Sequence, residues 1–395
     1  MRIIYFLLLV IVLHLPLTSQ YLIGYTSTTF NDPARSNRAV DAKIFYPSLN
    51  AGANVPSAPG QYPLVIVGHG FAMGIDAYEH MAERLVPLGY IVVLCNTETS
   101  FSPNHQEFGR DLLFLSNEIK QLSILDQLFP LYGNLNLKSA IMGHSMGGGA
   151  TILAASYANL SEVDCIAAFA PAETTPSAIT AAASVQVPTL IFAGQGDMVT
   201  PPANHQTPIY NAISSPCATY IQINGGGHCL FAKSNVACDF GETMSGCSIS
   251  ISRESQQDIM FNLLIPYLNY FLKDQSASLH TFRDTLTISS RFTYQTKNCE
   301  TLSLHQSGNS SFSINWFNIS ASHILQFSGN FTTNEQLGVD IIDMNGRQLY
   351  QKSFEILSGH HSISIQLPAL SSGYYLARFS TSSFHHTRKF IITKP

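Results

Sequence analysis

Apolar and polar positions form two different patterns along the chain, and the change falls near residue 275. Before it, short apolar runs typical of buried strands alternate with segments whose apolar residues recur at helical spacing. The runs predict strands at 39–46, 63–67, 90–94, 139–142, 163–169, 188–193 and 219–223. The helical spacing predicts helices at 76–85, 107–128, 148–157, 208–213 and 252–273. This alternation predicts an α/β fold, a mostly parallel sheet with helices on both faces.

Beyond residue 275 the helical spacing disappears, and short alternating runs are separated by turn signals such as Asn345-Gly346. Strands are expected at 312–317, 324–327, 339–343, 348–354, 361–367, 374–379 and 388–392. They predict a separate, small all-β sandwich. We therefore expect an α/β domain over 20–275, a linker over 276–310 and the β-sandwich over 311–395.

The first nineteen residues have the features of a secretory signal peptide: Arg2, a short apolar stretch over 3–13 and a small-residue site near Ser19. A membrane anchor is the alternative, but the stretch is shorter than the roughly twenty residues that span a bilayer. Secretion places the seven cysteines in an oxidising compartment. Cys238 and Cys247 form the expected disulfide, Cys229 could pair with either instead, and Cys95 is expected to be a buried free thiol.

Composition narrows the possible functions. Only 11% of residues are charged, the net charge is −5 and there is no long basic run, which disfavours nucleic-acid binding. No cysteine and histidine spacing matches a zinc site. We therefore expect neither a metal nor a cofactor.

The segment Gly143-His144-Ser145-Met146-Gly147 lies between a predicted strand and a predicted helix. Gly-x-Ser-x-Gly in this context is typical of a nucleophile elbow, in which a strained turn lifts the serine hydroxyl above the sheet. The glycines are needed because larger side chains would collide with the neighbouring strand and helix. We expect Ser145 to be a nucleophile.

A serine nucleophile needs a base, and the base needs a group that orients it. In this fold the chain order is Ser, then Asp or Glu, then His. Asp197 follows the predicted strand 188–193, and His228 follows the next strand after three glycines, so both occupy the required places. Glu173, which follows a strand end one strand earlier, is the alternative acid.

An oxyanion hole requires two backbone N–H donors. One should belong to Met146, the residue after the nucleophile, and the other to the loop after the strand at 63–67. Phe71 is our choice within that loop, and its ring would also form a wall of the acyl pocket. The alternative for Phe71 is ordinary core packing.

Together, 143–149 (GHSMGGG), 187–193 (VPTLIFA), 208–210 (PIY) and 223–228 (INGGGH) resemble bacterial cutinase-like polyester hydrolases, including poly(ethylene terephthalate) hydrolases. They also resemble the neighbouring dienelactone hydrolase, chlorophyllase and platelet-activating-factor acetylhydrolase group. The resemblance implies an α/β-hydrolase fold with Ser145, Asp197 and His228 as triad, and Phe71 and Met146 as oxyanion donors. The chain departs from the polyester hydrolases at His144, where they usually have Trp, and after Ala170-Pro171, where their aromatic clamp is missing.

The last segment is similar to a different family. Residues 339–346 (VDIIDMNG), 367–375 (LPALSSGYY) and 387–393 (TRKFIIT) resemble the C-terminal sorting domain of type IX secretion in Bacteroidetes. That resemblance implies export across the outer membrane, with the type IX machinery as partner and the cell surface or the medium as destination. A surface-binding or carbohydrate-binding β-sandwich is the alternative.

These features together predict a secreted, monomeric serine carboxylester hydrolase that acts on a small ester or a polyester surface. A small-ester or lipid esterase, or an acyltransferase with the same triad, is the alternative among enzymes. A non-catalytic surface-binding protein is the alternative outside them.

Overall fold

The computed structural model describes residues 21–159, 162–297, 312–319, 324–331, 334–343, 347–381 and 385–392. The expected signal peptide at 1–19 lies outside these residues. The chain divides into two compact units, one that ends at Tyr294 and one that begins at Gln295 and also takes in Ser215–Thr219. Within the described ranges, no helix combines the length and the apolar character needed to cross a membrane.

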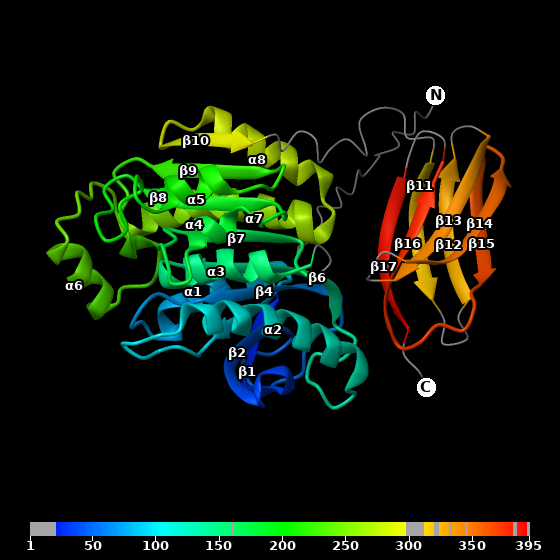
Figure 1. Cartoon of the computed structure of the whole chain (residues 1–395), viewed down its shortest axis with the longest axis horizontal. Helices are drawn as coiled ribbons and strands as arrows, with labels where there is room; N and C mark the ends of the chain where they lie inside the picture. The colour runs from blue at the N-terminus through cyan, green and yellow to red at the C-terminus, as the bar shows by residue number, and fades with distance from the viewer. Residues whose placement is uncertain are drawn as a thin grey trace, which may run out of the picture. The chain divides into compact units, whose positions relative to one another are not determined.

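The first unit is built on a ten-stranded sheet, in which β4, β5, β6, β7 and β8 pair in parallel (Figure 1). Its spatial order is β10-β9-β8-β7-β6-β4-β5-β2-β1-β3. The strands are β1 Leu22–Asp32, β2 Arg38–Ser48, β3 Gly52–Ala53, β4 Tyr62–Gly68, β5 Ile91–Cys95, β6 Leu135–His144, β7 Cys165–Phe169, β8 Thr189–Gly194, β9 Ala218–Ile223 and β10 Phe292–Lys297. The central strands are buried along their whole length, as their continuous apolar runs predict.

Helices cover both faces of this sheet (Figure 1), which confirms the predicted α/β-hydrolase architecture. They are α1 Glu79–Leu85, α2 His105–Leu125, α3 Met146–Tyr157, α4 Ala178–Ala182, α5 Gln206–Ala212, α6 Val236–Met244, α7 Arg253–Lys273 and α8 Ser276–Ile288. Side chains of α1, α7 and α8 share one buried apolar core against the sheet. Helices α2 and α3 pack against each other, and Gly109 of α2 leaves no room for a side chain beside Leu153.

The polar stretch 20–38, in which no strand was expected, contains β1. This strand pairs antiparallel with β2 near the edge of the sheet, and most of its residues are exposed or half-buried, with Phe30 among the few buried ones. A strand that buries so few side chains needs no apolar run, so its sequence gives little indication of a strand.

The expected loss of helical structure after residue 275 is wrong. Residues 276–297, expected as part of a linker, contain α8 and β10. Phe282, Leu286 and Phe292 are buried in the core of the first unit, and β10 extends the sheet beside β9. Polar residues surround these three positions in the sequence. The apolar stripe of α8 is therefore too narrow to be recognised as a helical pattern.

The second unit consists of two small antiparallel sheets, and each of the seven strands expected there is present. The sheets have the orders β11-β12-β15 and β14-β13-β16-β17. The strands are β11 Phe312–Ile319, β12 Ile324–Phe331, β13 Glu335–Asp343, β14 Gln348–Ile356, β15 Gly359–Gln366, β16 Gly373–Ser380 and β17 His385–Ile392. One apolar core joins the sheets, with Phe327 and Phe379 in edge-to-face contact at 4.7 Å between ring centroids.

A disulfide links Cys229 to Cys238, so the expected Cys238–Cys247 pairing is wrong. The alternative partner, Cys229, pairs with Cys238 at a Cα–Cα distance of 5.8 Å, while helix α6 carries the chain away from Cys238 by a rise of about 9 Å up to Met244. Disulfides bridge Cα atoms less than about 7 Å apart. Cys217 is also disulfide-bonded, while Cys95, Cys165 and Cys247 are free thiols and the first two are buried.

Candidate active site

The nucleophile elbow has the geometry that its glycines predict. Ser145 lies between β6 and α3 with φ 55° and ψ −117°, a strained conformation for a residue with a side chain. A Cβ atom on Gly143 would lie 2.1 Å from the Gly147 carbonyl oxygen, and one on Gly147 would lie 2.3 Å from that of Gly68. Both positions therefore require glycine. The turn leaves the Met146 N–H at the first residue of α3, where a helix favours negative charge.

Asp197 and His228 lie side by side, after β8 and β9. His228 Nδ1 is 2.8 Å from Asp197 Oδ2, and both side chains are buried. Because an ionised carboxylate only accepts hydrogen bonds, Nδ1 carries the proton of the neutral ring and Nε2 is left as the basic nitrogen. Asp197 Oδ1 also accepts the N–H groups of Val199 and Thr200, at 2.8 and 2.9 Å.

The sequence analysis missed two residues that hold this pair. Thr200 Oγ1 donates to Asp197 Oδ2 at 2.9 Å and lies 3.0 Å from His228 Nδ1. Gln206 Nε2 in turn donates to Thr200 Oγ1 at 3.1 Å and to the Pro171 carbonyl at 2.8 Å. Thr200 and Gln206 therefore fix the orientation of the carboxylate and the ring together. The Asp-x-x-Thr spacing at 197–200 is the only sequence pattern that could have indicated the contact between Thr200 and Asp197.

His144, next to the expected nucleophile, connects the elbow to His228. Its ring is fully buried, with Nε2 3.0 Å from the His228 carbonyl oxygen and a distance of 4.8 Å between the two ring centroids. Burial is the larger cause, and repulsion from His228 the second, of a His144 pKa that lies well below 6.5. The neutral ring therefore donates from Nε2 and accepts the Tyr78 hydroxyl proton at Nδ1, 2.8 Å away.

Tyr78 carries this chain of hydrogen bonds on to the loop after β4. Its hydroxyl accepts the Gly70 N–H at 2.8 Å, and burial raises the pKa of the phenol. His69 fixes the same loop from the other side, with ring nitrogens 2.8 Å from the Gly70 carbonyl oxygen and 2.7 Å from that of Thr97. The backbone before Phe71 is therefore held rigidly.

The Phe71 ring does not pack into the core, which excludes that alternative. It is 47% exposed and meets the ring of Phe101, itself 86% exposed, edge-on at 6.1 Å. Two phenyl rings thus stand open to solvent on the two loops that follow β4 and β5. Met146, the other expected oxyanion residue, is buried.

The alternative acid and the other histidines have different partners. Glu173 accepts the Ile179 N–H at 2.9 Å, and its own N–H donates to His205 Nδ1 at 2.9 Å. Burial lowers the pKa of His205. His80 lies with Nε2 3.0 Å from the Phe231 carbonyl oxygen, and burial lowers its pKa to about 4. Asp197 is therefore the acid that contacts His228.

The segment around His228 is held by groups from α6 and α7. Gln256 makes two hydrogen bonds of 2.9 Å with the backbone of Gly227, and Glu242 Oε1 accepts the Cys229 N–H at 2.9 Å. Cys229, Asp239 and Glu242 also bring possible metal-ligand atoms within 4.8 Å of one another. The Cys229 sulfur is in a disulfide and Asp239 pairs with Arg253 at 2.8 Å, so we interpret this cluster as support for the loop.

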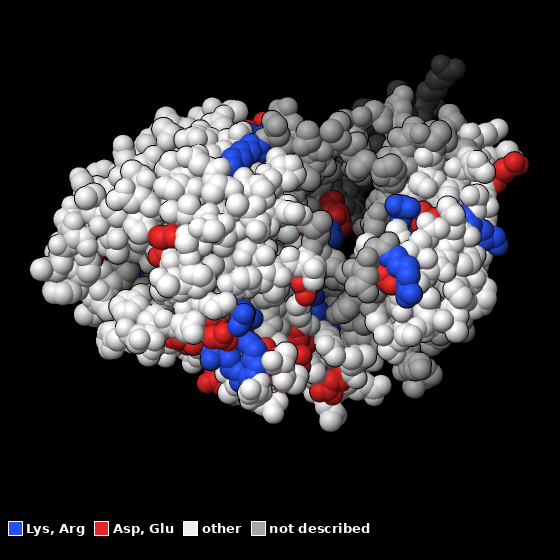
Figure 2. All heavy atoms as spheres, viewed as in Figure 1, with Lys and Arg blue, Asp and Glu red and all other residues white. Residues whose placement is uncertain are grey.

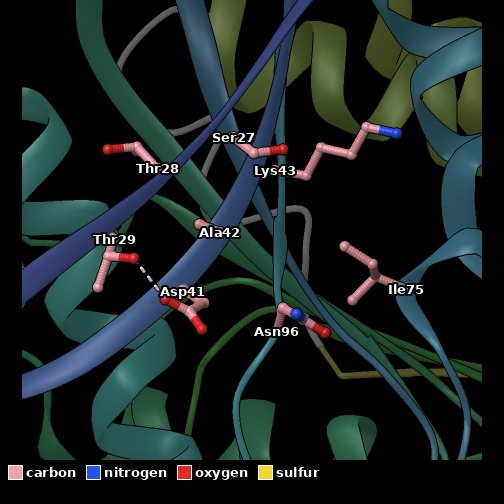
Figure 3. A pocket seen from close by; sticks show the side chains of 8 residues that line it. All are labelled: Ser27, Thr28, Thr29, Asp41, Ala42, Lys43, Ile75 and Asn96. Carbon is pink, nitrogen blue, oxygen red and sulfur yellow. Dashed lines mark hydrogen bonds between the residues drawn. The ribbon is translucent and has the colours of Figure 1, made fainter.

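A polar hollow of about 340 Å³ lies elsewhere on the first unit, lined by residues of β1 and β2 together with Ile75 and Asn96 (Figure 3). Thr29 Oγ1 donates to Asp41 there at 2.6 Å, and Lys43 pairs with Glu79 at 2.7 Å. Its lining includes none of the expected catalytic residues. Thr29, Asp41 and Lys43 therefore already have partners within the protein.

The sheet, its covering helices and the elbow define an α/β-hydrolase. The family comparison is more specific: residues 25–252, more than half of the chain, match the model described as PET hydrolase-like. The chain belongs to the PET hydrolase-like family.

Curated relatives agree with this assignment. The chain is 27% identical over 188 residues to bis(hydroxyethyl) terephthalate hydrolase of Streptomyces coelicolor, covering 47% of this chain and 54% of that protein. It is 27% identical to cutinase est1 of Thermobifida alba and 28% identical to a cutinase of Thermobifida fusca, each match covering 47% of this chain and 56% of the relative. The chain thus spans about half the length of these relatives.

The second unit matches a family of its own. Residues 313–393 match the model described as a secretion system C-terminal sorting domain. This match covers nearly all of the β-sandwich and confirms the resemblance predicted from its three sequence segments.

Proposed function

We propose that the protein is a secreted serine carboxylester hydrolase with Ser145, His228 and Asp197 as its triad. The observation that carries this proposal is the buried Asp197–His228 hydrogen bond, which is tied through His144 to the elbow that presents Ser145. The names of the relatives, a terephthalate ester hydrolase and cutinases, support the same reaction class.

In this mechanism His228 Nε2 removes the proton of the Ser145 hydroxyl as the serine oxygen attacks the ester carbonyl carbon. Asp197 keeps the imidazole in the required tautomer and stabilises the imidazolium. The imidazolium then protonates the departing alcohol. Water, activated by the same nitrogen, hydrolyses the acyl-enzyme and releases the acid. None of these steps needs a cofactor.

The N–H groups of Met146 and Phe71 would bind the oxyanion of the tetrahedral intermediate. Met146 begins α3, and the hydrogen bonds of His69 and Tyr78 fix the backbone at Gly70, next to Phe71. Donors that are held before the reaction begins stabilise developing charge without reorganisation.

For the substrate we propose an ester with an apolar acyl group, including polyester chains. The open rings of Phe71 and Phe101 would contact such a chain. The absence of an aromatic residue in 172–176 favours a second candidate, a small-ester or lipid esterase that releases little product from aromatic polyesters.

For the whole chain we propose a signal peptide at 1–19, an α/β-hydrolase unit, and a β-sandwich that directs type IX export to the cell surface or the medium. The sorting-domain match supports the export route. We propose that the enzyme acts as a monomer.

The proposal is tested by hydrolysis of a short p-nitrophenyl ester and of an amorphous polyester film, by the wild type and by Ser145→Ala. We expect turnover of the soluble ester to fall by at least about 10⁴-fold in Ser145→Ala with an unchanged melting temperature. Activity near that of the wild type would reject Ser145 as nucleophile. Release from the soluble ester alone would favour the second candidate substrate class.

A further inference from the structure

Helix α6 is amphipathic in the inverted sense: its apolar side faces solvent and its polar side faces the protein. Val236, Phe240 and Met244 are 88%, 66% and 71% exposed and recur every four residues, so they share one face. The opposite face carries Asp239, paired with Arg253, and Glu242, which is buried against the Cys229 N–H. Exposed apolar patches of this kind mark interaction sites in soluble proteins.

This helix is attached to both of the loops that carry the acid and the base. The Cys229–Cys238 disulfide near its start and the Glu242 hydrogen bond near its end both join it to Cys229, the residue after His228. After its end, the Ser248 N–H donates to the Gly196 carbonyl at 3.0 Å, next to Asp197. The exposed ridge is therefore a fixed extension of the region around the expected active site.

We propose that the ridge formed by Val236, Phe240 and Met244 is an adsorption surface that docks the enzyme on solid, uncharged polyester. Three side chains that stand out from a helix form a convex ridge, and a convex ridge fits a plane or a soft solid rather than a groove on another protein. In Figure 2 the left end of the first unit, where Figure 1 places α6, shows few Lys, Arg, Asp or Glu atoms.

The charge of α6 argues against a lipid surface as the occupant. Helices that lie on anionic membranes are rich in Lys and Arg on their polar face. Residues 236–244 contain neither, and their two charged residues, Asp239 and Glu242, are acidic. The proposal rests on the proposed function, because it adds a docking surface for the polymeric form of the same ester substrate.

The test uses the mature full-length chain carrying Ser145→Ala, so that adsorption is measured without turnover. Val236→Gln, Phe240→Gln and Met244→Gln are combined, since glutamine favours helices and adds no charge. The matched control replaces three exposed apolar residues away from the site, as Leu125→Gln, Leu128→Gln and Ile288→Gln. Binding isotherms are recorded on amorphous poly(ethylene terephthalate) film and on cellulose film.

We expect the α6 triple variant to bind the polyester film at least about tenfold more weakly, with the control triple variant and the binding to cellulose unchanged. In the active enzyme, the same α6 substitutions should reduce film hydrolysis and leave kcat/KM for a soluble p-nitrophenyl ester within about twofold. Phe240→Gln alone, expected to weaken film binding about threefold, keeps the test valid if the triple variant does not fold.

Four results would overturn the proposal. These are unchanged film adsorption, an equal loss in the control triple variant, a parallel loss of soluble-ester activity, and a wild-type dimer that the α6 variant converts to monomer. Film binding that stays intact while binding to phosphatidylcholine–phosphatidylglycerol vesicles is lost would assign the ridge to lipid instead. Absence of all ester hydrolysis in the wild type would reject the proposed function, and the adsorption result would stand separately.

Discussion

At the scale of single residues, Thr200 is the group outside the expected triad with the most direct contact to it. Its hydroxyl bridges Asp197 Oδ2 and Gln206, and lies 3.0 Å from His228 Nδ1. Such a contact orients the base without taking part in proton transfer. Thr200 is therefore a positioning residue for His228.

We predict that Thr200→Val lowers kcat about tenfold with little change in KM, because the carboxylate loses the donor that fixes its orientation. The free energy of unfolding should also fall by about 1 kcal/mol, as for a lost buried hydrogen bond. Steady-state kinetics on a soluble ester measure the first effect and urea denaturation the second. Thr200→Ser keeps the hydroxyl and should retain most of the activity; equal losses in both variants would contradict the positioning role.

His80 makes the stability of the fold depend on pH. Burial lowers its pKa from 6.5 in the unfolded chain to about 4, so between these values the unfolded chain binds the additional proton. The free energy of unfolding therefore decreases as pH falls below about 6.5, by about 2 kcal/mol from His80 alone at pH 5. Buried His144, whose pKa is also lowered, adds to the loss in the same direction.

We predict that His80→Gln reduces this acid destabilisation, since glutamine can still donate to the Phe231 carbonyl but does not titrate. Urea unfolding at pH 7.5 and pH 5 measures the difference for both proteins. The same difference in the variant as in the wild type would show that His80 does not cause it.

The sequence predicted the expected catalytic residues better than their supports, for a physical reason. Ser145, Asp197 and His228 follow strand ends in a set order, and strand ends can be located from apolar runs. Thr200 and His144 act through contacts between loops that are distant in the chain, and no local pattern encodes those contacts. Even so, the catalytic roles of the triad remain predictions that the Ser145→Ala experiment tests.

At the scale of elements, buried strands and long amphipathic helices could be predicted, whereas some short or mostly polar elements could not. Strands β4, β5, β7 and β8 are buried along their whole length, whereas β1 lies near the edge of the sheet and buries few of its residues. Helix α6 was not among the expected helices, because the apolar residues of its inverted pattern face solvent. Its nine residues give only two turns of periodicity.

The disulfide that closes the loop before α6 gives a prediction at this scale. Removing it with Cys229→Ser and Cys238→Ser should lower the free energy of unfolding by about 2–3 kcal/mol, the chain-entropy value for a loop of this length. Guanidinium denaturation of the full-length chain measures the change. A midpoint equal to that of the wild type would mean that Glu242 and Arg253 hold the loop without the disulfide.

At the scale of the whole molecule, the boundary between the two units decides which piece of the chain can fold. The first unit needs α8 and β10, because Phe282, Leu286 and Phe292 belong to its core. Burial of each such side chain contributes about 1.5–3 kcal/mol. Their sum is comparable to the total stability of a domain.

We predict that a chain of residues 20–300 unfolds cooperatively and hydrolyses a soluble ester within about twofold of the full-length rate. A chain of residues 20–275 should be insoluble or unfolded, because it lacks that part of the core. Thermal unfolding followed by circular dichroism and an ester assay distinguish the two. A folded, active 20–275 chain would restore the boundary predicted from the sequence.

The position of β10 at the end of the sheet also sets the timing of folding. A chain that leaves a channel from its N-terminus cannot complete the ten-stranded sheet until residue 297 has emerged, only fifteen residues before β11 begins. The last strand of the first unit and the first strand of the sorting unit therefore leave the channel at almost the same moment. Closure of the ten-stranded sheet thus has to wait until the chain has reached the point where the sorting unit is about to begin.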